Sequence, residues 1–307
     1  MCKIYPKIII FLSFAVLMMC CGCGKDESIN VRQEEISVPG LTKEHKIIFL
    51  SDSHISMCDE RDADVLEKAK SREASFSADG ILPQDRFRSL IKYAKKSDCE
   101  TVILGGDILD SAMYASIEYV DGELSTLPMQ YLFLMGNHDF EYGSEYFSEN
   151  AYNTYLPRLD KMRSNTSYQI YETDDIIYFT VDDGCNRISS EALEAYKSIT
   201  DKGKPIVVAT HIPIEPVTGD TSLTNECINV WGATDTGKTK VTYGPNGLTG
   251  DPVTMEFVDL VTSQDSPVVL VLAGHIHFYH KDMLNDHTLQ IVSGAAYEGE
   301  AIEIVLK

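Results

Sequence analysis

Apolar runs that end abruptly on polar residues recur five times along the 307-residue chain. Short, uninterrupted apolar runs are typical of strands that are buried in a parallel sheet. The run at 101–104 is followed by two glycines, which favour a tight turn, and then by Asp107. The other four runs end near Asp52, Asn137, His211 and His275. Because open α/β sheets bind ligands beyond the carboxyl ends of their strands, the pattern predicts an α/β fold with a site at that edge.

The residues at these strand ends are of the types that bind metal ions. A single Asp or His after a strand is more often a turn residue, but five such ends in order indicate a metal site. Asp52 and His54 lie two residues apart, a spacing that places both side chains on the same side of an extended chain and within reach of one cation. His275 and His277 repeat this spacing. Asp110, three residues after Asp107, is either a helix cap or a further member of the site.

The segments between the strands have the patterns of helices and of a hairpin. Pro83 opens an amphipathic helix, residues 189–198 have a helical pattern, and Asp251 and Pro252 are a good cap and first residue for another helix. Residues 168–181 alternate between apolar and polar positions, as a hairpin does. These helices lie between the apolar strands in the sequence, as the connections of an α/β fold do.

The least regular part of the chain lies between Glu215 and Asp251. Within it, residues 232–239 match the phosphate-loop pattern G-x-x-x-x-G-K-[ST], which requires a buried strand before it and a helix after it. The preceding apolar run is short and interrupted, and the following residues include Gly and Pro. We therefore expect a hairpin that overhangs the site, and not a nucleotide-binding loop.

The N-terminal residues have the pattern of an export signal. Lys3 and Lys7 precede an apolar run at 8–19 that is too short to span a bilayer as a mature helix, so we expect a signal peptide over residues 1–23. Gly22 before Cys23 resembles a bacterial lipoprotein signal, in which the cysteine is lipidated, and Cys20 is the competing position. The expected location is the outer face of the cytoplasmic membrane, reached through a lipid anchor; the alternatives are simple secretion and an uncleaved anchor.

The polar, aperiodic residues 24–40 are expected to be a tether, which leaves 41–307 as one folded domain. The whole chain has 26 basic and 47 acidic residues and a formal net charge of −21. Such a surface repels nucleic acid and anionic headgroups, so no nucleic-acid partner is expected. The spacing of the four cysteines after the signal matches neither a zinc nor a disulfide framework: Cys58, Cys99, Cys185 and Cys227. The sequence leaves the oligomeric state open.

Five blocks, taken in order, resemble the calcineurin-like metallophosphoesterase family: Asp52-x-His54, Gly106-Asp107-x-x-Asp110, Gly136-Asn137-His138-Asp139, His211 and Gly274-His275-x-His277. The resemblance runs from about Lys46 to the C-terminus. It implies a four-layer αββα sandwich with two mixed sheets and a dinuclear metal site at one edge. The implied ligands of the first ion are Asp52, His54 and His277, those of the second are Asn137, His211 and His275, and Asp107 bridges the two ions. His138 resembles the residue that faces the leaving-group oxygen, and Asp110 would orient its ring.

The chemistry of this ligand set agrees with the resemblance. Two divalent ions about 4 Å apart can share a hydroxide that attacks phosphorus, while the ions neutralise the phosphoryl oxygens. We therefore expect a metal-dependent hydrolase of small phosphoric monoesters or diesters, with Mn, Zn, Fe or a mixture as the metals. Ser111 stands where the protein phosphatases of the family carry Arg, which disfavours a protein substrate. The alternative function is a non-catalytic cell-surface binding module that retains the fold.

Overall fold

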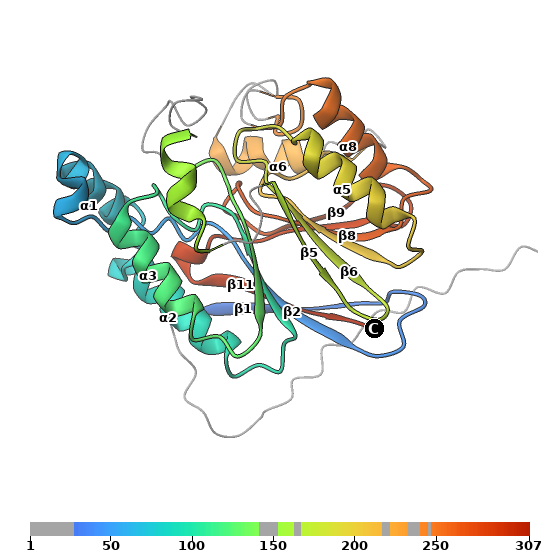
Figure 1. Cartoon of the computed structure of the whole chain (residues 1–307), viewed down its shortest axis with the longest axis horizontal. Coiled ribbons are helices and arrows are strands. Elements are labelled where there is room, and N and C mark those ends of the chain that lie inside the picture. Colours follow the sequence, from blue (N-terminus) through green and yellow to red (C-terminus); the bar gives the residue numbers. More distant parts are fainter. Residues whose placement is uncertain (1–27, 141–152, 163–166, 217–221, 233–239, 245–246) are drawn as a thin grey trace, which may run out of the picture.

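Two β-sheets pack face to face at the centre of the molecule, and helices cover the outer face of each sheet (Figure 1). The structure is a computed structural model and describes residues 28–140, 153–162, 167–216, 222–232, 240–244 and 247–307. The layers are helix, sheet, sheet and helix. The predicted αββα sandwich is therefore confirmed.

The first sheet has five strands in the order β1, β11, β2, β3 and β4. Their bounds are Asn30–Ile36, Glu300–Leu306, His45–Leu50, Thr101–Gly105 and Gln130–Leu134. β11 runs parallel to β1 and antiparallel to β2, and the pairs β2 with β3 and β3 with β4 are parallel. The sheet is therefore mixed, as predicted, and the carboxyl ends of β2, β3 and β4 meet at one edge.

The second sheet has six strands in the order β5, β6, β7, β8, β10 and β9. Their bounds are Tyr168–Glu172, Ile177–Val181, Ile206–Ala209, Val268–Ala273, Leu289–Val292 and His280–Met283. β5 and β6 form the predicted hairpin. Each of the neighbouring pairs β6 with β7, β7 with β8 and β8 with β10 is parallel. The carboxyl ends of β7 and β8 therefore also lie together.

Helices flank both sheets and connect their strands. Their bounds are Leu66–Ser75 for α1, Pro83–Ala94 for α2, Tyr114–Leu124 for α3, Ser190–Thr200 for α5, Ser222–Trp231 for α6 and Pro252–Thr262 for α8. Short 3-10 turns occur at Glu60–Val65, Ala78–Gly80, Leu156–Leu159 and Ala296–Glu298. The predicted helix at Pro83 is confirmed, and the Asp251 carboxylate caps α8 by accepting from the backbone amides of Val253 and Thr254. None of the helices in the described ranges is long and apolar enough to cross a membrane.

The apolar core has three layers that follow from this architecture. Phe49 and Ile103 of the first sheet and Val207 of the second lie in the cluster between the sheets. The outer face of the first sheet packs against α2 and α3, and that of the second sheet packs against α5 and α8. Strands buried on both faces need continuous apolar runs, which explains the pattern that the sequence shows.

The structure corrects two expectations about connecting segments. Residues 24–40 are not a tether throughout, because 30–36 form β1, which pairs with β11 at the edge of the first sheet. An edge strand is held by backbone hydrogen bonds and exposes many of its side chains, so it needs no apolar pattern. The hairpin expected within 215–251 is also wrong for 222–231, which form α6. Leu223 and Cys227, four residues apart, bury one face of this helix.

The phosphate-loop pattern falls mostly outside the described residues, which exclude 233–239. The residues directly before it form α6 and not a strand. A nucleotide-binding loop requires a strand directly before it, and the described residues at that place form a helix instead. This agrees with the prediction that the pattern is not such a loop.

Candidate metal centre

The predicted ligands gather where the carboxyl ends of the central strands meet. Asp52 and His54 follow β2, Asp107 follows β3, and Asn137 follows β4. The other three ligands come from the second sheet: His211 follows β7, and His275 and His277 follow β8. Ligands from both sheets therefore meet at one end of the sandwich.

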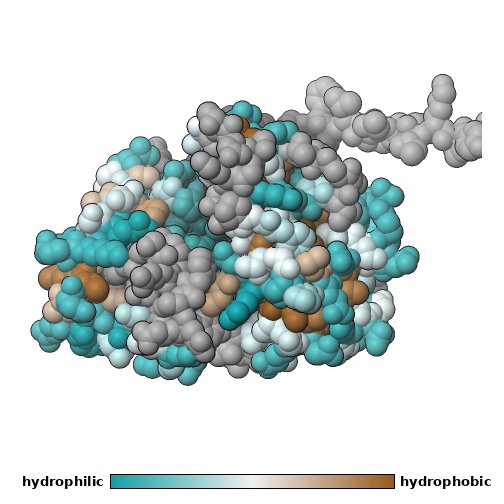
Figure 2. Space-filling view, turned by 90° about the horizontal axis from the view of Figure 1, so that it is seen from above, coloured by the Kyte–Doolittle hydropathy of each residue, from teal (hydrophilic) through white to brown (hydrophobic). Residues whose placement is uncertain are grey.

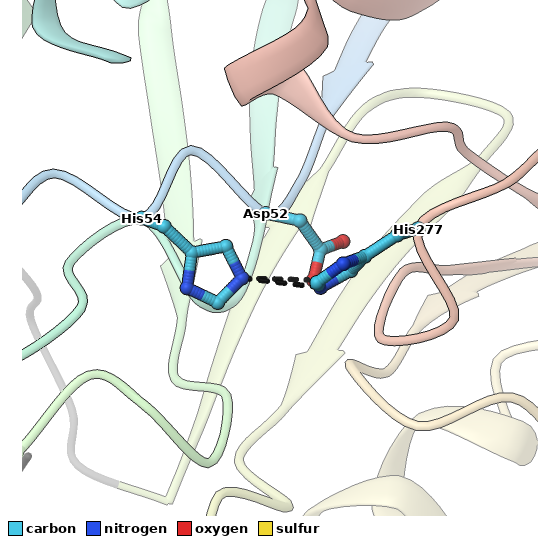
Figure 3. A group of neighbouring side chains, drawn as sticks. All are labelled: Asp52, His54 and His277. Atoms are coloured by element: carbon cyan, nitrogen blue, oxygen red, sulfur yellow. Dashed lines mark hydrogen bonds and ion pairs between the residues drawn. The ribbon is translucent and has the colours of Figure 1, made fainter. Parts of the chain in front are cut away.

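Asp52, His54 and His277 form the first group of candidate ligands (Figure 3). Nε2 of His277 lies 3.3 Å from Oδ1 of Asp52, and the Nε2 atoms of the two histidines are 3.1 Å apart. The Nδ1 atom of His54 lies 3.2 Å from Oδ1 of Asp110, and since a carboxylate can only accept, Nδ1 carries the proton. The lone pair of His54 Nε2 is then directed toward His277 and Asp52. This donor set fits a divalent cation between the three side chains.

Asn137, His211 and His275 form the second group. Nδ1 of His275 lies 3.0 Å from Oδ1 of Asn137 and 3.3 Å from Nε2 of His211. The carbonyl oxygen of Gly105 lies 2.9 Å from His211 Nδ1 and accepts a hydrogen bond from it, so Nδ1 carries the proton and the lone pair of the ring is on Nε2. An amide oxygen and two imidazole nitrogens that converge in this way fit a second cation.

The Asp107 carboxylate lies between the two groups. Its Oδ2 atom is 3.2 Å from Nε2 of His211 and 3.8 Å from Nε2 of His54. Burial opposes the ionisation of Asp107, but the neighbouring histidines, above all His211, lower its pKa well below the usual value. Burial also lowers the pKa of His54 to about 4, which favours the neutral imidazole that a metal ligand requires.

Five of the seven candidate ligands have left-handed backbone conformations. The φ angles are 59° for Asp52, 47° for His54, 51° for Asp107, 73° for His275 and 66° for His277. The prediction that Asp52 and His54 share one side of an extended chain is therefore wrong, although the two side chains do converge. Such conformations cost about 1–3 kcal/mol each and persist only where the surroundings impose them. Here the left-handed turn after each strand directs the ligands toward the centre. The alternation of side chains along an extended strand does not.

Two buried carboxylates to which the sequence assigned no role hold these turns in place. Asp139 accepts hydrogen bonds from the backbone amides of Asp107, Leu109 and Gly136 at 2.7–2.8 Å. Asp183 accepts from the amide of His211 at 3.1 Å and from that of Ile212 at 2.9 Å. Asp139 belongs to the Gly136-Asn137-His138-Asp139 block, which was the available signal. Asp183 follows β6, and no pattern in the sequence marked it.

Close approach of the turns also requires glycine. Gly106 has a φ of 87°, and a Cβ atom added there would lie 2.6 Å from Nδ1 of His211. Any side chain at this position would displace a candidate ligand. Gly106, between β3 and Asp107, thus allows the two sheets to bring their ligands together.

His138 and Asp110 lie beside the first group. Nδ1 of His138 is 3.1 Å from Oδ1 of Asp110, and the backbone amide of His138 donates to Asp107 at 2.7 Å. Burial lowers the pKa of His138, but Asp107 and Asp110 outweigh this effect and raise it overall. Asp110 is fully buried and caps no helix, since α3 begins at Tyr114 with Met113 at its N-cap. The alternative that Asp110 is a helix cap is therefore wrong.

Three further residues at the site were missed from the sequence. Arg72 of α1 donates two hydrogen bonds to Asp110, at 2.7 and 2.6 Å. Phe76 stacks on the ring of His54 with a centroid separation of 4.0 Å, and the hydroxyl of Tyr297 lies 3.4 Å from Nδ1 of His277. Arg72 and Phe76 come from the charged segment between β2 and α2, where no strand end marked a site.

The histidines that match no strand end lie outside the centre. His45 is fully buried and lies 2.9 Å from Glu100 and 2.6 Å from Asp175. His280 pairs with Glu226 of α6, and His287 lies 2.9 Å from the carbonyl oxygen of Ser266. The four cysteines after the expected signal peptide are all free.

Comparisons with solved structures found proteins that share the fold. The solved structures of similar fold include a dimetal phosphatase from Danio rerio, at 11% identity and a TM-score of 0.50, covering 83% of this chain and 88% of that one. They also include the purple acid phosphatase PPD1 from yellow lupin (Lupinus luteus), at 12% identity and a TM-score of 0.49, covering 85% of this chain and 45% of that one. No curated protein matches the sequence.

The family comparison covers most of the chain. Residues 45–279 match the model of the family described as calcineurin-like phosphoesterase. This range contains all seven candidate ligands as well as His138 and Asp110. The family match supports a metal-dependent hydrolase of phosphoric esters. The chain belongs to the calcineurin-like phosphoesterase family.

Proposed function

We propose that this protein hydrolyses small phosphoric monoesters or diesters at a centre of two metal ions. The observation that carries the proposal is the position of Asp107, whose Oδ2 atom lies 3.2 Å from His211 of one ligand group and 3.8 Å from His54 of the other. A carboxylate placed between two sets of nitrogen and oxygen donors is suited to bind two cations at once. The mixed donor set favours Mn, Zn, Fe or a mixture of these.

Two ions at this centre would supply an activated water as the nucleophile and would neutralise the charge of the phosphoryl oxygens. The protein's own residues supply the remaining steps. Asp139 and Asp183 hold the ligand-bearing turns through backbone amides, so the ligands need not rearrange when an ester binds. The site is then organised before the substrate arrives.

His138 is the candidate proton donor to the departing oxygen. Its Nδ1 atom is held 3.1 Å from Asp110, which leaves Nε2 as the nitrogen that can face a substrate. The neighbouring carboxylates raise the pKa of His138, which favours the protonated ring that a general acid needs. The side chain is 17% exposed, whereas that of Asp110 is fully buried. His138 therefore combines access to solvent with a fixed orientation.

The protein's exterior supports a small substrate. Hydrophilic residues predominate on the described surface of the face shown in Figure 2. With a formal net charge of −21, this exterior disfavours long polyanions such as nucleic acid. A small phosphate ester carries too few charges to be excluded in this way, and the cations of the centre would attract it.

We also propose that the protein is exported and held at the outer face of the cytoplasmic membrane by lipid on Cys23 or Cys20. The charged start, the apolar run at 8–19 and the small residue before Cys23 support this proposal. Residues 1–27 lie outside the described part of the chain. Secretion without a lipid is the alternative.

An assay of the purified protein with p-nitrophenyl phosphate and with bis(p-nitrophenyl) phosphate tests the function. We expect turnover of at least one ester after loading with Mn, Zn, Fe or Ni, and loss of turnover after chelation. The Asp107→Asn variant, assayed in parallel, should lack this activity. If the loaded protein turns over neither ester, the chain is instead a binding module that retains the fold.

A further inference from the structure

Arg72 makes a two-point contact with the buried carboxylate of Asp110. Its Nε atom donates to Oδ2 at 2.7 Å and its Nη2 atom donates to Oδ1 at 2.6 Å. A planar guanidinium that binds both oxygens fixes the carboxylate in its own plane, which a single hydrogen bond does not do. The orientation of Asp110 is therefore set by a residue of α1, some forty positions earlier in the chain.

Because Asp110 contacts two histidines, its orientation also affects theirs. Its Oδ1 atom lies 3.2 Å from Nδ1 of His54 and 3.1 Å from Nδ1 of His138. One oxygen thus contacts a candidate metal ligand and the candidate proton donor, while the other oxygen contacts Arg72 alone among the described contacts. A rotation of the carboxylate would lengthen both contacts to the histidines. Arg72 prevents that rotation.

Arg72 is itself held in place by an aromatic ring of the site. Its guanidinium carbon lies 4.8 Å from the ring centroid of Phe76, four residues later at the end of α1. Phe76 in turn stacks on His54 at 4.0 Å with an interplanar angle of 7°. Arg72, Phe76, His54 and Asp110 therefore form a closed set of contacts around the first group of ligands.

We propose that Arg72 is the positioning residue of the phosphoester hydrolysis: it fixes Asp110 so that His138 is aimed at the leaving-group oxygen. The inference rests on the proposed function and adds a residue that lies outside the five sequence blocks. Arg72 acts on His138 through Asp110, and its Nη2 atom also lies 3.4 Å from Nδ1 of His138. The competing explanation is an ion pair that merely anchors α1 to the core.

Kinetics of the full-length protein at saturating metal separate these explanations. We expect Arg72→Gln to lower kcat on glycerol 1-phosphate by about 10- to 100-fold with little change in KM, because proton donation is worth about 10²- to 10⁴-fold and would be only partly lost. The loss on p-nitrophenyl phosphate should be small, since nitrophenolate departs without a proton. Arg72→Lys should recover only part of kcat, because an ammonium cannot bind both carboxylate oxygens in a fork.

The decisive measurement is a double-mutant cycle with His138→Ala. If Arg72 acts through His138, adding Arg72→Gln to His138→Ala should leave kcat on glycerol 1-phosphate unchanged. Losses that multiply in the double variant would overturn the proposal, as would an Arg72→Gln effect on KM alone, which would indicate direct binding of phosphate.

Arg61→Gln is the matched control. Arg61 forks to Asp59 and Glu118 in the same way, but its side chain is 40% exposed and it contacts none of the residues of the centre among its described partners. Its removal should leave kcat on both esters at the wild-type value. If Arg61→Gln lowers kcat as Arg72→Gln does, the effect comes from loss of an ion pair and the proposal fails. A wild-type protein without turnover would refute the proposed function itself, whereas an active wild type with fully active Arg72 variants would refute this inference alone.

Discussion

The carboxylate of Asp139 accepts a hydrogen bond from the backbone amide of Asp107 at 2.8 Å. Both residues are buried, and Asp139 also binds the amides of Gly136 and Leu109. The same carboxylate therefore joins the turn after β3 to the turn after β4, and these turns carry Asp107 and Asn137. One side chain thus couples these two ligand-bearing turns to each other.

Removing this carboxylate should damage stability and metal binding together. In Asp139→Ala, three buried amides lose their acceptor, so we expect the free energy of unfolding to fall by about 3 kcal/mol. Metal content should fall as well, because the turns that aim Asp107 and Asn137 are released. Urea unfolding and metal analysis of the purified variant measure the two effects.

Asp251→Ala is the control for this prediction. Asp251 also accepts from backbone amides, but at the N-terminus of α8 and away from the centre. Its loss should cost about 1 kcal/mol of stability, as for other helix caps, with metal content unchanged. Full metal content in Asp139→Ala would show that the turns hold their shape without this carboxylate.

Loss of Asp107 should remove more metal than loss of any other ligand. Asp107 lies against both ligand groups, so Asp107→Ala weakens two sites at once, whereas Asp52→Ala and Asn137→Ala each weaken one. Metal analysis of the three purified variants, loaded and dialysed side by side, checks the order. If Asp107→Ala retained two ions at wild-type affinity, Asp107 would not bridge them.

His138→Ala should affect esters according to their leaving groups. General acid catalysis contributes about 10²- to 10⁴-fold when the departing oxygen is basic, so hydrolysis of an alkyl phosphate should fall by that factor. Hydrolysis of p-nitrophenyl phosphate should fall far less, and the metal content should stay the same. Steady-state kinetics on both esters, with metal analysis, give the comparison.

The same experiment distinguishes other roles of His138. Equal losses on both esters would mean that the ring stabilises the phosphoryl oxygens, and loss of metal would mean that it is a ligand. His287→Ala serves as the control, because His287 lies at the carbonyl of Ser266 and matches no strand end. Its kinetics on both esters should equal those of the wild type.

Lipid attachment is tested by labelling in a bacterial host. A labelled fatty acid should enter the wild-type protein, and the combined Cys20→Ser and Cys23→Ser change should abolish labelling because it removes both candidate thiols. Cys58→Ser, a cysteine of the folded domain, should label normally. Recovery of unlabelled wild-type protein from the culture medium would contradict the anchor.

Local patterns in the sequence were enough to predict the central strands and the candidate metal ligands at their ends. β2, β3, β4, β7 and β8 are each a continuous apolar run that stops at a turn, and such runs are decided by burial on both faces. The residue types at their ends indicated a metal centre, because few other sites need Asp, Asn and His together. The αββα arrangement of the strands came from the resemblance to a family and is confirmed.

Other features depend on contacts between distant parts of the chain. β1 is polar and forms only because β11, at the far end of the sequence, offers it a parallel partner. The left-handed turns at His54 and His277 are imposed by tertiary contacts, since an isolated histidine has no preference strong enough to adopt them. Neither feature produces a recognisable pattern of hydrophobic and polar residues in the sequence.

The sequence by itself determined which residues can bind metal and which strands carry them, because both properties are local. An apolar run specifies a buried strand, and the ability of a side chain to bind a metal depends on its own functional group. Only the tertiary structure decided how His138 is oriented. Arg72 reaches Asp110 because α1 packs beside the turn after β3, and this proximity follows from burial of side chains far apart in the chain. Contacts between side chains that packing brings together depend on the whole fold, so no short segment of the sequence encodes them.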